Sequence, residues 1–373
     1  MVVIESKDLD TLISALAKRG YDVIGPRIRD SAIVLDTVSG SEDLPKGWTA
    51  VQEPGSFRLE KREAGAYFGF TVGPHSWKKF LFPPRLRLFS ASRAGKGFEV
   101  NVDGNGSSHK YAFFGVRSCE IQALGLLDKV FKDGPYADHG YSALRPRTLI
   151  VAVNCVEPAG TCFCASMNTG PEARSGYDIV MTEILGPDRH VFMAEAGTDA
   201  GREILAEVPQ RQAEAVDAEA VQKAMSEASA RMGRQMVSGN LRPMANEQFD
   251  HPRWDELAKR CLGCTNCTMV CPTCFCTTVE DVTDLTGATA ERWRRWDSCF
   301  TGDFTKVAGG NIRMSTKSRY RQWITHKLVN WVDQFGSPGC VGCGRCITWC
   351  PVGIDITQEA AAFVNAQNVK PTT

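Results

Sequence analysis

The sequence predicts an α+β protein of more than one domain, with an N-terminal α/β domain followed by a helical, cysteine-rich domain. Three observations predict this arrangement. A chain of 373 residues is long enough for about two or three domains. Strand and helix patterns alternate in the first half, whereas helical patterns prevail in the second. Cysteines are absent from residues 1–118, number four in 119–164 and eleven in 261–350. We therefore predict an α/β domain over 1–210, a helical connection and linker over 211–250, and a helical domain over 251–373.

The overall composition argues against several classes of protein. Lysine plus arginine and aspartate plus glutamate both total 43, so the formal net charge is zero, and no basic field favours nucleic acid. No apolar run reaches about 18 residues, so we expect no membrane span. The first residues lack a basic region followed by an apolar stretch, so no signal peptide is evident. We therefore expect a cytoplasmic protein.

The fifteen cysteines stand out in such a chain. Disulfides rarely persist in a reducing cytoplasm, and an odd number cannot pair completely within one chain. Metal ligation explains the thiols better. Thiolates are natural ligands for zinc and for iron–sulfur clusters.

The first half has the periodicities of an α/β fold. Residues 8–20 have helical spacing, with Asp8 or Asp10 as a candidate N-cap. Strand patterns rich in β-branched and aromatic residues cover 31–38, 110–116, 148–153, 177–184 and 189–196. A helical pattern separates the second of these strands from the third, which favours a parallel pair with a helical crossover. Residues 73–89, which include Pro83 and Pro84, are expected to form an extended loop.

The second half is expected to be helical. Residues 211–240 are polar and helix-prone, and they have one apolar stripe, formed by Val221, Met225, Ala228 and Met232. A linker over 239–249 and a short helix that starts near Pro252 lead to the first cysteine motif. A longer helix is predicted over 313–336, with an apolar stripe formed by Tyr320, Ile324, Leu328, Trp331 and Phe335.

Two cysteine motifs give the strongest signal, and each has the spacing C-x2-C-x2-C-x3-C followed by proline. Three thiolates of one loop can wrap three corners of a 4Fe–4S cubane, and in two-cluster ferredoxins the fourth cysteine ligates the other cluster. This predicts two clusters. Site A comprises Cys261, Cys264, Cys267 and Cys350. Site B comprises Cys340, Cys343, Cys346 and Cys271.

The surroundings of the motifs fit clusters better than zinc. Gly263, Gly342 and Gly344 are expected to relieve crowding where the backbone approaches the sulfides, and the proline stops each loop from continuing as helix. Two zinc sites are the alternative, but zinc motifs usually show paired C-x2-C units with a longer gap. Cys271 and Cys340 are separated by 68 residues, which we expect to be largely helical. This arrangement resembles the α-helical ferredoxin domain of electron-transfer subunits.

The predicted helix over 313–336 also has a basic remainder, formed by Arg313, Lys317, Arg319, Arg321 and Lys327. We interpret it as a solvated face, as charge runs usually are. The alternative is electrostatic. A cubane with four thiolates carries about two negative charges, so nearby cations would raise its potential.

A third cluster is predicted in the first half, at site C. Cys119 follows one strand of the predicted parallel pair and Cys155 follows the other, so both lie at the carboxyl ends, where open α/β sheets bind ligands. A helix N-terminus there would favour an anionic complex. Site C comprises Cys119, Cys155, Cys162 and Cys164. The alternative is buried, reduced cysteine that packs as a small apolar residue.

A weaker constellation repeats the tetrapeptide TCFC at 273–276. Cys274, Cys276 and Cys299 could hold a further metal, with Asp297 as a candidate fourth ligand. The alternatives are packing, or one thiol that tunes a cluster by hydrogen bonding. No G-x-G-x-x-G follows a strand, and Gly104 and Gly106 lie in a polar turn. We therefore expect no flavin or nickel in this chain, and hydride chemistry would belong to a partner.

Several segments together resemble one family. They are GVRSCEIQAL, NCVEPAGTCFCASMNTGP, CLGCTNCTMVCPTCFC, RWDSCF, RYRQWITHKL and CVGCGRCITWCPVGIDIT. The sequence resembles the beta subunits of cytoplasmic, NAD(P)-linked NiFe hydrogenases of the sulfhydrogenase type, and the electron-transfer subunit of anaerobic sulfite reductase is a close relative of these. The resemblance runs from about residue 70 to about residue 358 and is densest after residue 260.

The resemblance implies a non-catalytic electron-transfer subunit in a larger complex. Hydrogenase large and small subunits would hold the nickel–iron site and further clusters, and a flavin subunit would exchange hydride with NAD(P)H. This chain would relay electrons between them. Three alternatives stay open: the same relay in an anaerobic sulfite reductase, a thiol enzyme that acts through Cys274, Cys276 and Cys299, and a zinc-stapled assembly scaffold.

Overall fold

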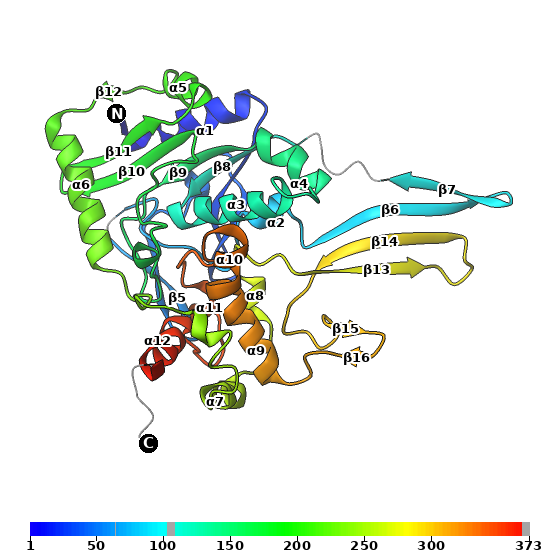
Figure 1. Cartoon of the computed structure of the whole chain (residues 1–373). Helices are drawn as coiled ribbons and strands as arrows, with labels where there is room; N and C mark the ends of the chain where they lie inside the picture. Colours follow the sequence, from blue (N-terminus) through cyan, green and yellow to red (C-terminus); the bar gives the residue numbers. More distant parts are fainter. Residues whose placement is uncertain (64, 103–108, 368–373) are drawn as a thin grey trace.

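The computed structural model describes residues 1–63, 65–102 and 109–367, and it has a mixed α/β fold (Figure 1). The turn with Gly104 and Gly106 lies outside the described residues. The main body is built on an eight-stranded sheet, and a four-stranded sheet extends away from it. The helices of the cysteine-rich half lie in the lower part of the view in Figure 1.

The eight-stranded sheet has the order β12-β1-β11-β10-β9-β8-β2-β3. Its strands are β1 (Val2–Glu5), β2 (Asp22–Arg29), β3 (Ala32–Thr37), β8 (Tyr111–Val116), β9 (Leu149–Val153), β10 (Ile179–Gly186), β11 (Arg189–Ala196) and β12 (Arg211–Gln212). The central strands β2, β8, β9 and β10 run parallel, and the outer strands pair antiparallel. The predicted parallel pair is confirmed, because β8 leads through α3 (Ser118–Phe131) to β9.

Helices cover both faces of this sheet (Figure 1). One face packs against α1 (Leu9–Lys18) and α5 (Asp199–Leu205), and the other packs against α2 (Lys78–Leu81), α3 and α4 (His139–Leu144). In β9, Val151 and Val153 belong to the first core, while Ile150 and Ala152 belong to the second. A strand buried on both faces is apolar throughout, and β9 has that composition. The helix expected over 8–20 is confirmed by α1.

The four-stranded sheet joins segments that are far apart in the sequence. Its order is β13-β14-β6-β7, with β6 (Arg85–Ala94), β7 (Gly97–Val102), β13 (Thr277–Thr283) and β14 (Thr289–Trp296). Because β6 pairs with β14, residues of the predicted N-terminal domain share a sheet with residues of the predicted C-terminal domain. A small hairpin follows, formed by β15 (Lys306–Val307) and β16 (Gly310–Asn311).

Two expectations are wrong in this region. Residues 73–89 contain α2 and the first half of β6 instead of forming an extended loop. Residues 277–311, between the two cysteine motifs, contain four strands, so this connection is not largely helical. The two segments meet where β6 pairs with β14, and a local pattern cannot reveal such a distant partner.

The helices of the second half pack around a core that includes Trp254, Phe300, Trp323, Ile347 and Phe363. These helices are α7 (Arg253–Arg260), α8 (Asn266–Met269), α9 (Thr316–Thr325), α10 (Trp331–Phe335), α11 (Arg345–Thr348) and α12 (Ile356–Gln367). A π-helical turn (His326–Asn330) joins α9 to α10. The helix predicted over 313–336 is therefore confirmed, with its apolar stripe facing the interior.

The remaining elements complete the body. Helix α6 (Ala215–Ala230) confirms the helix predicted within 211–240, and Met225 and Ala228 of its apolar stripe are buried. A two-stranded sheet is formed by β4 (Trp48–Glu53) and β5 (Ser56–Lys61). In the parts of the chain that the structure describes, no helix has the length and apolar character needed to span a bilayer.

Candidate iron–sulfur cluster sites

Site A lies where the first cysteine loop meets the end of the second. Helix α7 ends at Arg260, and the chain turns through Gly263 (φ +63°) and Thr265 (φ +70°) before α8 begins. One pocket is lined by all four cysteines predicted for site A, together with Phe300, Tyr320 and Trp323. The structure thus brings Cys261, Cys264, Cys267 and Cys350 together.

Backbone amides already point at two sulfur atoms of site A. The Gly263 N–H donates to Cys261 Sγ at 3.4 Å, and the Ile354 N–H donates to Cys350 Sγ at 3.3 Å. Such bonds favour the negatively charged form of sulfur. Burial and the neighbouring thiols raise the pKa of Cys267 well above its usual value. A thiolate at this position therefore requires a cationic partner, which a bound metal supplies.

Site B forms around the second cysteine loop. Burial raises the pKa of Cys346 well above its usual value, and the neighbouring Cys340, Cys343 and Cys271 raise it further. Cys271 comes from the first motif, 69 positions before Cys340. It nevertheless lies among the cysteines of the second loop, as an exchange of fourth ligands between the motifs requires.

Lys327 is a buried cation in direct contact with site B. Its Nζ donates to Cys271 Sγ at 3.1 Å, to Thr273 Oγ1 at 2.9 Å and to the Gly339 carbonyl at 3.1 Å. Only 4% of Lys327 is exposed. The expectation that it belongs to a solvated face is therefore wrong. Lys327 lies in the π-helical turn, where the two residues that follow it are buried as well, so the chain is covered on more than one side there.

The contact between Lys327 and Cys271 stabilises opposite charges. A hydrogen bond from the Cys274 thiol and the Lys327 ammonium hold the pKa of Cys271 well below its usual value despite its burial. Burial alone would lower the pKa of Lys327, but the neighbouring Cys271, Cys274 and Cys340 raise it well above the usual value. The Cys274 thiol and Lys327 thus favour the thiolate form of Cys271, which is the form that ligates metals.

Site C lies at the carboxyl ends of β8 and β9. Because these strands are parallel, Cys119 in the first turn of α3 and Cys155 just after β9 reach the same edge of the sheet. Burial raises the pKa of Cys164, and Cys162 and Cys155 raise it further. Burial raises the pKa of Cys119 as well, with Cys164 as the next cause. The four cysteines predicted for site C are thus buried neighbours.

The loop of site B packs directly against the loop of site C. A Cβ on Gly342 (φ +65°) would lie 2.7 Å from the backbone of Cys164, and one on Gly344 (φ +75°) would lie 2.5 Å from the Thr161 carbonyl oxygen. Another segment of the chain therefore crowds both glycines, and the expected relief of crowding near the sulfides stays a prediction. A Cβ on Gly263 would meet nothing within 4 Å.

The third set of thiols lies at the base of the four-stranded sheet. The antiparallel register pairs Thr277 with Trp296, which places Cys276 beside Asp297, and the Asp297 N–H donates to the Cys276 carbonyl at 2.8 Å. A hydrogen bond from Cys299 lowers the pKa of Cys276 to about 7. In the described part of the chain, no three His, Cys, Asp or Glu side chains are grouped closely enough for a single metal ion. A metal held by Cys274, Cys276 and Cys299 stays a prediction.

A second buried lysine, Lys78 of α2, was not found from the sequence. Its Nζ donates to the carbonyls of Cys271 at 3.1 Å and Cys274 at 2.7 Å, and lies 3.8 Å from the centre of the Trp296 ring. Burial lowers the pKa of Lys78 to about 8. The sequence gives no signal for this role, because Lys78 belongs to a segment without strong periodicity and reaches the backbone of cysteines almost two hundred positions away.

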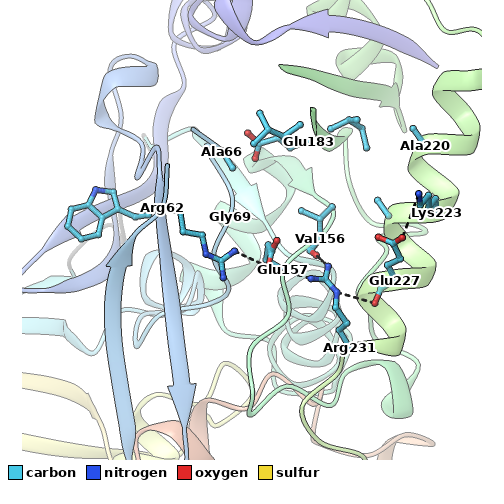
Figure 2. Close-up of a pocket in the computed structure, with 14 residues that line it drawn as sticks. Arg62, Ala66, Gly69, Val156, Glu157, Glu183, Ala220, Lys223, Glu227 and Arg231 are labelled. Atoms are coloured by element: carbon cyan, nitrogen blue, oxygen red, sulfur yellow. Dashed lines mark hydrogen bonds and ion pairs between the residues drawn. The ribbon is translucent and has the colours of Figure 1, made fainter. Parts of the chain in front are cut away.

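A separate pocket between β4 and α6 contains no cysteine among its lining residues (Figure 2). Its charged side chains are paired, most of them with one another, and Glu183 contacts His190 at 2.7 Å. Glu157 contacts Arg62 at 3.4 Å and Arg231 at 3.8 Å, and Lys223 lies 4.0 Å from Glu227. Because these charges are matched in pairs, the pocket presents no excess charge that would select a ligand.

The donor sets at sites A, B and C fit iron–sulfur chemistry, because each site offers four sulfur atoms. Backbone amides at site A and the Lys327 ammonium at site B also favour thiolates. Two loops of this spacing on a helical core define the class, a 4Fe–4S dicluster protein. Comparison with known families agrees, since residues 260–354 match the model described as "4Fe-4S dicluster domain".

A relative identifies the family more closely. Over 282 residues the chain is 36% identical to Sulfhydrogenase 2 subunit beta of Pyrococcus furiosus, an alignment that covers 74% of this chain and 79% of the relative. The chain belongs to the family of sulfhydrogenase beta subunits. The resemblance found in the sequence is therefore confirmed. No solved structure matches the chain.

Proposed function

We propose that this chain is the iron–sulfur electron-transfer subunit of a cytoplasmic NiFe hydrogenase. It relays electrons between a flavin subunit that binds NAD(P)H and the large and small hydrogenase subunits. The family membership supports the hydrogenase context. The observation that carries the relay is the contiguous series of cysteine groups, in which site B adjoins both site A and site C.

The series can be followed from one thiol to the next. Burial is the main cause that raises the pKa of Cys267 at site A and of Cys346 at site B, and the nearby Cys271 thiol raises both further. On the other side, the pKa of Cys164 at site C is raised by burial and also by Cys343 of site B. Short steps between neighbouring centres are what a chain of electron carriers requires, and each thiol group in this series adjoins the next.

The residues of the chain hold and shield the centres. A 4Fe–4S cluster, when bound, takes up and releases single electrons. The thiols of sites A, B and C hold the clusters, Lys327 compensates negative charge at site B, and burial keeps water from site C. Cys264 is exposed, so site A is the end of the series at which a partner exchanges electrons. The domain division at 1–210, 211–250 and 251–373 and the further metal site are parts of the same proposal.

The test uses the complete complex, purified without oxygen. The Cys261→Ser variant should lose about four irons per chain and reduce hydrogen-dependent NAD(P) reduction to background. Leu262→Ser is the matched control, because Leu262 lies in the same loop but is 67% exposed, and it should keep both iron and activity. Unchanged iron content and electron transfer in Cys261→Ser would contradict the proposal.

The composition of the purified complex separates the hydrogenase from the alternative. A flavin subunit and a nickel-containing large subunit, identified by mass, are expected to copurify with this chain. Siroheme absorption in place of nickel would overturn the hydrogenase assignment and favour the electron-transfer subunit of an anaerobic sulfite reductase. The iron–sulfur relay within this chain would stand in either complex.

A further inference from the structure

Arg345 lies inside the cysteine loop of site B, between Cys343 and Cys346, but its side chain points out of that loop. Only 1% of Arg345 is exposed. Its Nε donates to the Gly73 carbonyl at 2.8 Å, and its Nη2 donates to the His75 carbonyl at 2.8 Å. A cation from the second half of the chain is thus buried in the first half.

The anionic partner of Arg345 is Glu120, which directly follows Cys119 of site C. Arg345 Nη2 donates to Glu120 Oε1 at 2.6 Å, and Trp77 Nε1 donates to Glu120 Oε2 at 2.9 Å. Glu120 is 5% exposed. A single buried ion pair therefore connects the ligand loop of site B with the first turn of α3, which carries a predicted ligand of site C.

The guanidinium of Arg345 also adjoins thiols of both sites. Arg345 is two residues from Cys343 and one from Cys346 in the loop of site B, and its partner Glu120 directly follows Cys119 of site C. The Nη1 atom is buried, and it has no hydrogen-bond partner among the described residues. A charged side chain whose Nη1 group has two uncommitted N–H donors thus connects the loop of site B with the segment that carries Cys119.

Stability alone does not account for this pair. Removing two charges from water is costly, and apolar side chains of the same volume often stabilise a fold equally well or better. A buried charge does, however, act strongly on other charges nearby, because the protein interior screens it less than water does. The pair connects sites B and C, so the charges on which it acts are those of the cysteine groups at these two sites.

We propose that Arg345 and Glu120 are positioning residues that jointly set the reduction potentials of the clusters at sites B and C. The inference rests on the proposed function, because it requires a cluster at site C. A cation near a cluster favours the reduced, more negative form and raises the potential, whereas an anion lowers it. Since the pair adjoins both sites, each of its two charges shifts the potential of site B in the same direction as that of site C, which keeps the two potentials matched.

The test measures the cluster potentials in the anaerobically purified complex by redox titration with electron paramagnetic resonance. Glu120→Gln keeps the shape of the side chain and an acceptor for Trp77 but removes the negative charge. It should raise the potentials of the clusters at sites B and C. Arg345→Gln should lower both, and the double variant should fall between the single variants. Asp217→Asn is the matched control, since Asp217 is a buried carboxylate paired with Arg211 and is not a neighbour of any cysteine described above.

If the cluster potentials shift in opposite directions in the two single variants, the role is electrostatic. A loss of structure would shift the potentials in the same direction in both variants. If Arg345→Gln does not assemble, Glu120→Gln decides the question by itself. Unchanged potentials in Glu120→Gln with full iron content would overturn the proposal. So would a shift at only one of the two sites, because the pair would then not act on both.

The iron bound to this chain in the unmodified complex, after subtraction of the partner subunits' clusters, separates this failure from a failure of the proposed function. About eight irons per chain would mean that site C holds no cluster, which would overturn the relay through site C and the joint tuning with it. About twelve irons per chain, with cluster potentials unchanged by both substitutions, would leave the relay intact. This result would overturn only the role of Arg345 and Glu120.

Discussion

Replacing Lys327 by methionine should lower the potential of the cluster at site B. The substitution keeps a long, unbranched side chain in the buried position but removes the ammonium that donates to Cys271 Sγ at 3.1 Å. It also removes the donor to the Thr273 hydroxyl and to the Gly339 carbonyl. The electron that reduces the cluster would then be added without a compensating positive charge, so reduction becomes less favourable.

The magnitude follows from the distance between the charges. At an effective dielectric constant of about 20, unit charges 3.1 Å apart interact by about 5 kcal/mol. The added electron is shared over four irons, so about a quarter of this, roughly 1.3 kcal/mol, acts on reduction. That is nearly a tenfold change in the equilibrium constant, and for one electron it corresponds to a decrease of about 60 mV.

A redox titration of the anaerobically purified complex measures this shift. Lys327→Gln keeps an N–H donor without the charge, so it should reproduce most of the decrease if charge is the cause. Lys327→Arg keeps the charge and should lie close to the unmodified protein, although the fork-shaped guanidinium fits the site less well. A potential unchanged in Lys327→Met, with iron content and unfolding temperature preserved, would refute the reasoning.

Two further predictions concern the scaffold around the sites. Gly342→Ala should lower the free energy of unfolding by roughly 2–4 kcal/mol, because it adds a clash with Cys164 at 2.7 Å to the strain of a positive φ. Gly263→Ala has nearly the same φ but open space, so chemical denaturation should show a loss of only about 1 kcal/mol; equal losses in the two variants would contradict the packing argument. Asp217→Asn should lower the unfolding free energy at neutral pH by about 2 kcal/mol, because hydrogen bonding to Arg211 holds the pKa of Asp217 well below its usual range. A depressed pKa stabilises the fold above about pH 4 and loses this effect as the pH falls below that value, so the difference between variant and unmodified protein should shrink in acid; a difference independent of pH would exclude the pair as its source.

The sequence was sufficient for elements whose pattern is local. The apolar runs at 110–116 and 148–153 with a helix between them predicted a parallel pair, and β8, α3 and β9 confirm it. The parallel pairing in turn explains why Cys119 and Cys155 reach one edge of the sheet. The spacing of the cysteine motifs likewise predicted the grouping of Cys350 with the first loop, and these cysteines line one shared pocket.

The sequence was not sufficient where a partner lies far along the chain. Arginine alternates with leucine in 85–88, which is a strand pattern, but Pro83 and Pro84 directly before it favoured a loop. The pairing of β6 with β14 joins residues about two hundred positions apart, and no local pattern encodes such a distance. That pairing also explains Lys78, since α2 leads into β6 and is thereby brought to the thiols at the base of the sheet.

The buried cations were missed for a related reason. A helical pattern assigns Lys327 to a polar flank, but the π-helical turn changes the facing of residues 326–330 relative to a regular α-helix. Arg345 lies between two cysteines of a motif, a position where a charged residue could have been noticed. Its partner Glu120 lies in the other half of the chain, so only the folded structure identifies the pair.

The most direct test of the account is the amount of iron and acid-labile sulfide bound to this chain in complex purified without oxygen, after subtraction of the clusters carried by the partner subunits. Three 4Fe–4S clusters at sites A, B and C predict about twelve irons and about twelve sulfides per chain. A brown protein with these ratios would support cysteine groups that carry electrons. A colourless protein that contains zinc and no labile sulfide would contradict the account.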